Sequence, residues 1–280
     1  MIVSDKMLLH KLKQKNNALK IIWLNLLNAI CAWRVWFYLG SQDIRNMYRR
    51  SRMGASWLLI NMIITSSGLG YLYGNLFNQN LKDFFLRILL SMTIWGFLSG
   101  TIIQGCSAFI ISEGYIKQFS FGKQIYSLRL CVPLIFNLFL GFVVCIVMAV
   151  IFSIPVSFSF FPFISGLMLF LLVGLGHILL MPYWGTKYRD LSPALSGLFQ
   201  IIFYITPIIF TSDMLDSRNL GFIYEYNPYY YLIEIVRFPI LQGKFASSEI
   251  YQYCSYYCLM IWFLYALVVY RNDNRIIYWL

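Results

Sequence analysis

The sequence predicts an all-α integral membrane protein in which six transmembrane helices follow an amphipathic helix at the membrane surface. Hydrophobic residues make up 60% of the 280 residues and charged residues only 12%, and the mean hydropathy is +0.67. A soluble domain is nearer half apolar and a quarter charged. The apolar residues also gather in runs long enough to cross the roughly 30 Å hydrocarbon core of a bilayer. These observations place the chain in a membrane.

The N-terminal region is expected to form a cytoplasmic tail over residues 1–30, followed by a surface helix over residues 31–52. The short apolar run 21–33 resembles a signal peptide, but Asn25 and Asn28 interrupt it, which favours a retained tail. Apolar residues recur at helical spacing in Trp33, Trp36, Phe37, Gly40, Ile44, Met47 and Tyr48. Arginines and other polar residues occupy the rest of the helical wheel. This pattern is typical of a helix lying in a membrane interface.

The rest of the chain, with the surface helix, is expected to form one transmembrane domain over residues 31–280. Its six apolar runs cover residues 56–77, 86–111, 130–152, 161–183, 193–211 and 251–270. Between the last two runs, residues 212–250 form the longest external stretch. Asn227-Pro228 is typical of a helix cap and first helical position, while Glu234 and Arg237 interrupt any spanning run. We therefore expect a re-entrant or surface hairpin there.

The basic residues indicate the orientation. If the N-terminus is cytoplasmic, the cytoplasmic segments hold 17 of the 22 Lys and Arg residues, and the external segments hold six of the 11 acidic ones. Positive charge is enriched in the cytoplasmic loops of membrane proteins. Both termini are therefore expected in the cytoplasm. The net charge of +11 is accounted for by this topology, so no nucleic-acid partner is indicated.

Small residues and cysteines give weaker signals. The pairs Gly70/Gly74 and Gly96/Gly100 have the spacing that lets helix backbones approach closely. They are candidates for packing between two subunits, and packing within one subunit is an equal alternative. The six cysteines and two histidines show no metal-ligand spacing and no disulfide framework, so no metal site is expected.

Four motifs resemble one known family. They are Asp43-Ile-Arg-x-x-Tyr-Arg-Arg-Ser-x-x-Gly54-x-x-Trp57, Glu113-Gly-x-Ile-Lys-Gln118, Tyr188-Arg-Asp-Leu191, and Asn227-Pro-Tyr-x-x-Leu-x-Glu-x-x-Arg-x-Pro-Ile-Leu241. In order and spacing they are similar to the ABC-2 type permeases that export polysaccharides and O-antigens. The resemblance implies a homodimer in the bacterial cytoplasmic (inner) membrane. It also implies two copies of a separate ABC ATPase and a lipid-linked polysaccharide as cargo.

Energy for export is expected to come from another polypeptide. The chain lacks the Gly-x-x-x-x-Gly-Lys-Ser/Thr phosphate loop, so ATP and Mg²⁺ are assigned to the partner ATPase and no cofactor to this chain. The resemblance places contacts with that ATPase on the surface helix and on the 112–129 loop. The candidate coupling residues are Asp43, Arg45, Tyr48, Arg49, Arg50, Glu113, Gly114, Ile116, Lys117 and Gln118. For Glu113 and Lys117 the alternative is a surface pair at i,i+4, worth about 0.2–0.5 kcal/mol.

Tyrosines gather in the external segments. Sugar rings pack their C–H faces on aromatic rings, and phenol hydroxyls can bond to sugar hydroxyls. We therefore expect some of Tyr224, Tyr229, Tyr230, Tyr253 and Tyr257 to line a substrate channel or external gate. The alternative is an aromatic belt at the membrane interface, which uses the same residues at the same depth.

Two other functions are compatible with parts of the sequence. One is an ABC-2 permease for a small lipid or drug, which the motifs at 113–118 and 227–241 disfavour. The other is a multipass membrane transferase. Such an enzyme needs clustered Asp or His residues, whereas the seven Asp residues here are scattered along the chain.

Overall fold

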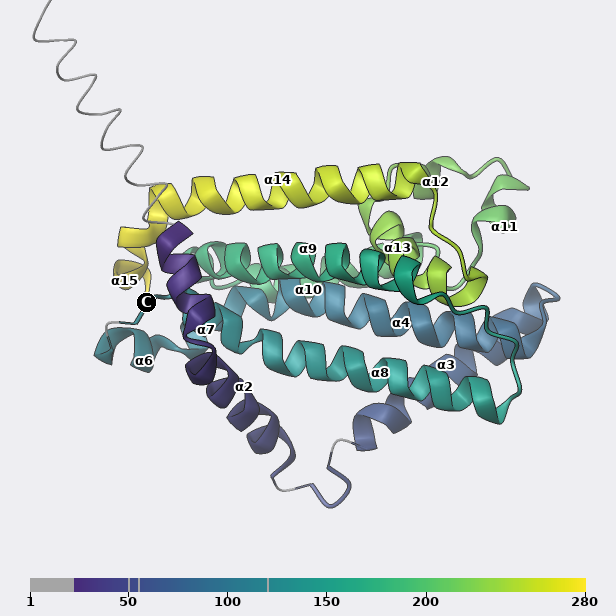
Figure 1. Cartoon of the computed structure of the whole chain (residues 1–280), viewed down its shortest axis with the longest axis horizontal. Coiled ribbons are helices and arrows are strands. Elements are labelled where there is room, and N and C mark those ends of the chain that lie inside the picture. The colour runs from purple at the N-terminus through teal and green to yellow at the C-terminus, as the bar shows by residue number, and fades with distance from the viewer. Residues whose placement is uncertain (1–22, 50, 55, 120) are drawn as a thin grey trace, which may run out of the picture.

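A computed structural model describes residues 23–280 except 50, 55 and 120. All regular elements in this part of the chain are helices (Figure 1). Four helical segments are long and apolar enough to cross a membrane: Leu81–Ile111, Gln124–Ile151, Phe160–Lys187 and Ser248–Asn272. They coincide with the runs expected at 86–111, 130–152, 161–183 and 251–270. The prediction of an all-helical membrane protein is confirmed.

The observed boundaries follow local capping and breaks. Helix α4 (Leu81–Ile103) begins five residues earlier than expected, because the Asn80 side chain accepts a hydrogen bond from the Lys82 amide and caps the helix. Beyond α4 the segment continues as η1 (Gly105–Ser107) and α5 (Ala108–Ile111). The next segment divides into α7 (Gln124–Arg129) and α8 (Cys131–Ile151), while α9 (Phe160–Lys187) and α14 (Ser248–Asn272) are continuous.

The two remaining expected spans differ from the other four. Helix α3 (Ser56–Leu76) has 21 residues, a length that covers about 30 Å, but Asn, Ser, Thr and Gly residues make it less apolar. Helix α10 (Leu191–Ile205) has only 15 residues. The expected run 193–211 is therefore corrected, because the helix ends before Thr206-Pro207 and a continuous crossing over 193–211 is not formed. Pro207 has no amide hydrogen with which to continue the helix.

Helices α4 and α9 form the centre of the molecule. Helix α4 packs against α3, α8, α9, α10 and α13, and α9 packs against α13 and α14. In Figure 1 the long helices α4, α8, α9 and α14 lie side by side, and the shorter α10 packs against α4 and α9. One end of this bundle carries α6 (Glu113–Gln118), α7, α15 (Ile276–Trp279) and the C-terminus; we call it the C-terminal end. The opposite end, the hairpin end, carries α11 (Ser212–Asp216), α12 (Phe222–Glu225) and α13 (Pro228–Gln242).

The N-terminal part of the described chain packs on the C-terminal end. Residues 23–31 are helical, with Leu26 and Ala29 buried, so packed structure includes residues that the sequence assigned to the tail. Helix α2 (Trp33–Tyr48) follows and leaves the bundle at an angle (Figure 1). It buries only Gly40 and exposes Trp33, Phe37 and Met47. An amphipathic helix with exposed large apolar side chains is typical of a helix that meets lipid.

Helix α13 is buried although it is too short to cross a membrane. Its position depends on close backbone approaches at two glycines. A Cβ at Gly166 of α9 would collide with the Ile235 carbonyl of α13, and one at Gly243 would collide with the Ser157 carbonyl. Gly243 also has φ +66°, the left-handed conformation that ends many helices at glycine. The hairpin expected over residues 212–250 therefore contains one deeply packed helix.

Candidate functional site

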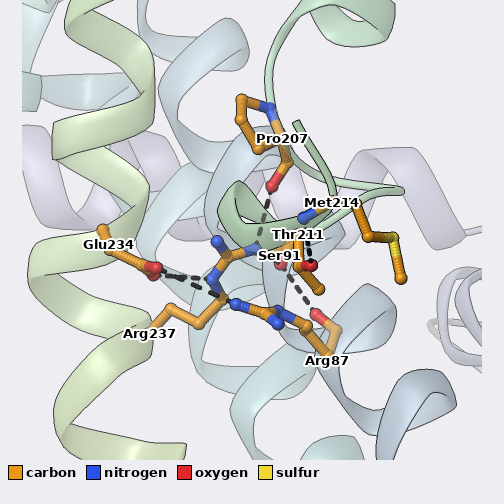
Figure 2. A network of polar contacts seen from close by, with 7 residues as sticks. All are labelled: Arg87, Ser91, Pro207, Thr211, Met214, Glu234 and Arg237. Carbon is orange, nitrogen blue, oxygen red and sulfur yellow. Dashed lines mark hydrogen bonds and ion pairs between the residues drawn. The ribbon is translucent and has the colours of Figure 1, made fainter. Parts of the chain in front are cut away.

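A buried ion pair lies at the centre of the hairpin end. Glu234 and Arg237 are one helical turn apart on α13, with only 6% and 1% of their surface exposed. The Arg237 Nε donates to Glu234 Oε2 at 2.8 Å. Figure 2 shows both side chains pointing from α13 toward α4. A buried charge is costly unless a partner and hydrogen bonds compensate it, and each of these residues supplies the other's partner.

The same arginine bonds to two other segments. Its Nη1 donates to the Ser91 hydroxyl of α4 at 2.7 Å and to the Pro207 carbonyl after α10 at 3.1 Å. Arg87, one turn before Ser91, approaches Glu234 with 3.9 Å between Nη2 and Oε1. Near this point the Asn227 amide donates to the Thr206 hydroxyl at 2.9 Å. One network therefore fixes α13, α4 and the 206–207 break to each other. We call Arg87, Ser91, Glu234 and Arg237 the hairpin network.

The sequence pattern identifies Glu234 and Arg237 only as residues that interrupt an apolar run. It does not predict their partners Ser91 and Pro207. The presence of two ionisable residues in this apolar segment was itself a signal of a functional position, because such residues are rare within membrane segments. The spacing of Glu234 and Arg237 by three residues also places them on the same side of a helix.

Four tyrosines at the hairpin end form a continuous chain of rings. The ring centroids of Tyr224 and Tyr230 are 4.8 Å apart, those of Tyr230 and Tyr231 5.3 Å, and those of Tyr231 and Tyr253 4.4 Å. The Tyr224 hydroxyl donates to the Asp216 carboxylate at 2.9 and 3.0 Å. Burial and this hydrogen bond raise the pKa of Tyr224 to about 12, so its hydroxyl stays protonated near neutral pH. The structure thus adds Tyr231 to the expected set.

The other two expected tyrosines lie apart from this chain. Tyr229 packs against Trp95 and Phe199, at centroid distances of 6.0 and 5.3 Å. Tyr257 lies on α14, one turn beyond Tyr253, and its hydroxyl is 3.0 Å from His177 Nε2 of α9. Both are partly buried between helices. They therefore join helices within the bundle. In the four-ring chain Tyr230 is buried, whereas Tyr224 and Tyr231 are partly exposed and Tyr253 is exposed. These three rings are the stronger candidates for a sugar-contacting surface, with Tyr230 packed behind them.

At the C-terminal end, Arg129 joins two of the expected coupling elements. Its Nε donates to Asp43 Oδ2 at 2.5 Å, and its Nη2 donates to the other carboxylate oxygen. Its guanidinium also lies over the Tyr115 ring, 5.8 Å from the centroid. Asp43 belongs to α2 and Tyr115 to α6, so α2, α6 and α7 meet at one side chain. Gly40 permits this approach, because a Cβ there would lie 2.6 Å from the Arg129 carbonyl.

The remaining coupling candidates fall into three groups. Arg45, Arg49, Gly114, Lys117 and Gln118 are exposed, and Tyr48 and Glu113 are partly exposed. Ile116 is buried in the hydrophobic core and anchors α6, so it is not available to a partner. Arg50 lies outside the described residues. Glu113 and Lys117 form the i,i+4 pair at 2.5 Å, and the hydrogen bond and charge of Lys117 lower the pKa of Glu113.

A second group of polar contacts, centred on Asp273 and called the Asp273 clamp, holds the C-terminal segment in place. The Tyr183 hydroxyl of α9 donates to Asp273 Oδ1 at 2.9 Å. Lys123, just before α7, approaches Asp273 Oδ2 at 3.3 Å and donates to the Asp273 backbone carbonyl. The loop that carries α6 is thereby tied to both α9 and the end of α14. Nothing in the sequence motifs predicted this clamp.

Three of the four candidate subunit-packing glycines are used within the chain. A Cβ at Gly70 would be 3.2 Å from Phe85 Cα, one at Gly74 2.7 Å from Leu81, and one at Gly100 2.6 Å from Leu134. These glycines pack α3 on α4 and α4 on α8. This agrees with the alternative interpretation, in which the glycines pack helices within one subunit. Gly96 differs, because it is exposed on α4 and nothing lies within 4 Å of its Cβ position.

The apolar bundle, with polar clusters at both ends and four segments able to cross a membrane, defines a multipass membrane protein. Residues 34–241 match the ABC-2 type transporter family, and the chain belongs to that family. It is also similar to the O-antigen export system permease protein RfbA of Klebsiella pneumoniae, with 20% identity over 195 residues, which is 67% of this chain and 73% of the relative. The resemblance in the motifs is thereby confirmed. Membership of this family implies a transport subunit that works with an ABC ATPase.

Proposed function

We propose that this protein is the membrane-spanning subunit of an exporter that moves a lipid-linked, O-antigen-like polysaccharide across a bacterial cytoplasmic membrane. The transporter would contain two copies of this chain and two copies of a separate ABC ATPase. Helices α3 and α10 would complete six membrane segments, with α2 at the interface and both termini in the cytoplasm. The similarity to an O-antigen export permease supports the choice of cargo.

The observation that carries the proposal is the separation of two kinds of surface. The C-terminal end exposes basic side chains on α2 beside the unit that Arg129 holds together. The opposite end holds the four-tyrosine chain next to a helix that does not cross the bundle. An ATP-driven exporter needs a cytoplasmic coupling surface and a hydroxyl-tolerant exit, because each unpaired polar group in hydrocarbon costs a few kcal/mol.

Helices α3 and α10 are the proposed surfaces for the second subunit. On α3 only Ser66, Gly70 and Gly74 are buried, while Ile64, Leu72 and Leu76 are exposed. On α10 only Phe199 is buried. Helices with so little burial in one chain are available to a second copy or to lipid. Exposed Gly96 of α4 would allow a close approach from that second copy.

The proposal is tested by purifying the chain with its ATPase and reconstituting both in vesicles that contain the lipid-linked polysaccharide. ATP-dependent transfer of glycan into the vesicle lumen is expected, with no transfer when the ATPase cannot hydrolyse ATP. Reversal of Arg49 and Arg50 to Glu should weaken the complex, whereas Arg218→Glu, an exposed arginine at the hairpin end, should not. ATP-dependent movement of short lipids but not of glycan would favour the small-lipid permease instead.

A further inference from the structure

A cavity of about 300 Å³ opens at the hairpin end, beside the hairpin network. Its walls come from the turn before α4, the first two turns of α4, the 154–156 loop, Thr211 and the last residues of α13. Six of the lining side chains are polar: Gln79, Asn80, Asp83, Arg87, Thr211 and Gln242. The volume is at the lower end of the range for small-ligand sites, about 300–1,000 Å³.

The composition of the lining selects a class of ligand. Three carboxamides, one carboxylate, one guanidinium and one hydroxyl supply both donors and acceptors. The single carboxylate and the single guanidinium balance in charge, which disfavours a strongly anionic or cationic ligand. Ile154, Pro155 and Val156 give the cavity an apolar wall. Adjacent hydroxyls that both donate and accept, next to an apolar C–H face, are the features of a neutral sugar.

The walls are held in place before any ligand binds. Lys82 Nζ donates to the Phe152 carbonyl at 3.3 Å, which ties the start of α4 to the loop after α8. Asn80 Oδ1 accepts from the Lys82 amide at 3.2 Å, so the position of its side chain is fixed. On the other side, the close approach of Gly243 to Ser157 fixes the end of α13. A preformed cavity lowers the ordering cost of binding.

We propose that this cavity binds one neutral sugar residue on each subunit, at the end of the bundle that the polymer would leave. The proposal rests on the proposed function for the source of the sugar and on the lining for its recognition. Arg87 gives the site a route to α13. Arg87 lines the cavity, and its Nη2 is 3.9 Å from Glu234 Oε1 in the hairpin network (Figure 2). A sugar that bonds to Arg87 would therefore act on that network.

The test is protection of a single cysteine from alkylation. Gln242→Cys is made in the full chain with exposed Cys31 replaced by Ser. The protein is purified in nanodiscs without ATPase and treated with a membrane-impermeant maleimide. Neutral methyl hexosides and methyl N-acetylhexosaminides are the probes. A sugar present at twice its Kd should slow alkylation about threefold, because only the empty third of the cavities reacts.

Four further variants make the result decisive. Ser217→Cys, an exposed position at the same end outside the cavity, should react equally fast with and without sugar. Gln79→Cys serves as a second reporter on the opposite wall, in case Gln242→Cys does not fold. The chain with Cys31→Ser alone gives the background from the buried cysteines. Gln79→Leu combined with Gln242→Cys should reduce the protection, because one amide is lost from the lining.

Two outcomes overturn the proposal. If none of the sugars changes the alkylation rate of Gln242→Cys or Gln79→Cys, the cavity is not a sugar site. Protection by inorganic phosphate or methyl glucuronide, with none from neutral sugars, would replace it by an anion site. The assay uses neither ATPase nor polymer, so it separates the two proposals. Protection by sugar without ATP-driven export would contradict only the proposed transport function. Export without protection by sugar would contradict only the sugar site.

Discussion

Arg129 donates hydrogen bonds from two nitrogens to the two carboxylate oxygens of Asp43, 86 residues earlier in the chain. This bidentate pair fixes α2 to α7, and the same guanidinium covers the Tyr115 ring of α6. Bidentate arginine–carboxylate pairs combine strength with a defined geometry. The pair therefore helps to tie α2, α6 and α7 into one unit at the C-terminal end.

The first prediction tests this pair. Asp43→Asn removes the charge and one acceptor, and should lower the free energy of unfolding by about 1–3 kcal/mol, because the bonds are charge-assisted and only partly exposed. The measurement is the thermal midpoint in nanodiscs. Arg45→Gln, on an exposed position of the same helix, is the matched control. Joint reversal to Asp43→Arg and Arg129→Asp should recover part of the loss; no recovery would contradict a specific pair.

The second prediction concerns the hairpin network. Glu234→Gln leaves Arg237 buried without a counter-charge, and breaking a buried ion pair in this way costs about 3–5 kcal/mol. Ser91→Ala should cost about 1 kcal/mol, since Nη1 of Arg237 still bonds to the Pro207 carbonyl. Thermal midpoints should therefore fall in the order parent, Ser91→Ala, Glu234→Gln. Glu225→Gln, an exposed acid at the same end, should match the parent.

The long apolar helices could be predicted from the sequence because membrane crossing imposes a length and a composition on each segment. Four of the six expected spans have these properties. Helix α3 shows why the two remaining spans were harder to predict. Its small residues Ser66, Gly70 and Gly74 pack on α4, and the residue types that allow this approach also lower its hydropathy. The end of α10 at Ile205 depends on Thr206-Pro207, a local break within an otherwise apolar run.

The sites were less predictable because their partners are distant in the sequence. The motif around Asp43 identified the residue but not Arg129, and the motif around Glu234 and Arg237 gave no indication of Ser91, 146 residues from Arg237. A helical pattern shows which residues share a face, but it does not show which helix covers that face. Tyr231 was omitted for the same reason, since its place between Tyr230 and Tyr253 requires α13 and α14 to be adjacent.

The third prediction tests orientation. Asn219 lies between α11 and α12 at the hairpin end. Lys123 precedes α7, and Lys187 at the end of α9 lies over the Trp279 ring of α15, both at the C-terminal end. The asymmetry of basic residues predicts that only Asn219 is external. Single cysteines at these positions are labelled in intact cells with a membrane-impermeant reagent, after replacement of the native cysteines. Labelling is expected at 219 alone. Labelling at 123 but not at 219 would reverse the topology.

The fourth prediction concerns pH and the Glu113–Lys117 pair. Because Lys117 lowers the pKa of Glu113, the pair adds stability above the unfolded pKa of about 4.3. That contribution is lost as pH falls through the folded pKa. Glu113→Gln should therefore lower the thermal midpoint slightly at neutral pH and not at all in strong acid. If this variant also leaves ATPase binding unchanged, the pair is only a surface contact. A loss of binding with normal stability would assign Glu113 to the coupling surface.

The last prediction separates a sugar-contacting surface from an interface belt. Joint replacement of Tyr224, Tyr230, Tyr231 and Tyr253 by Ala should slow glycan export while insertion and ATPase assembly persist, because stacking faces and hydroxyls are both removed. Replacement by Phe should cost less, since the ring faces remain. Tyr278→Ala, 87% exposed at the opposite end, is the control. Export, membrane insertion and co-purified ATPase are measured together. Normal export by the Ala set, or loss of export together with insertion, would identify these rings as an interface belt.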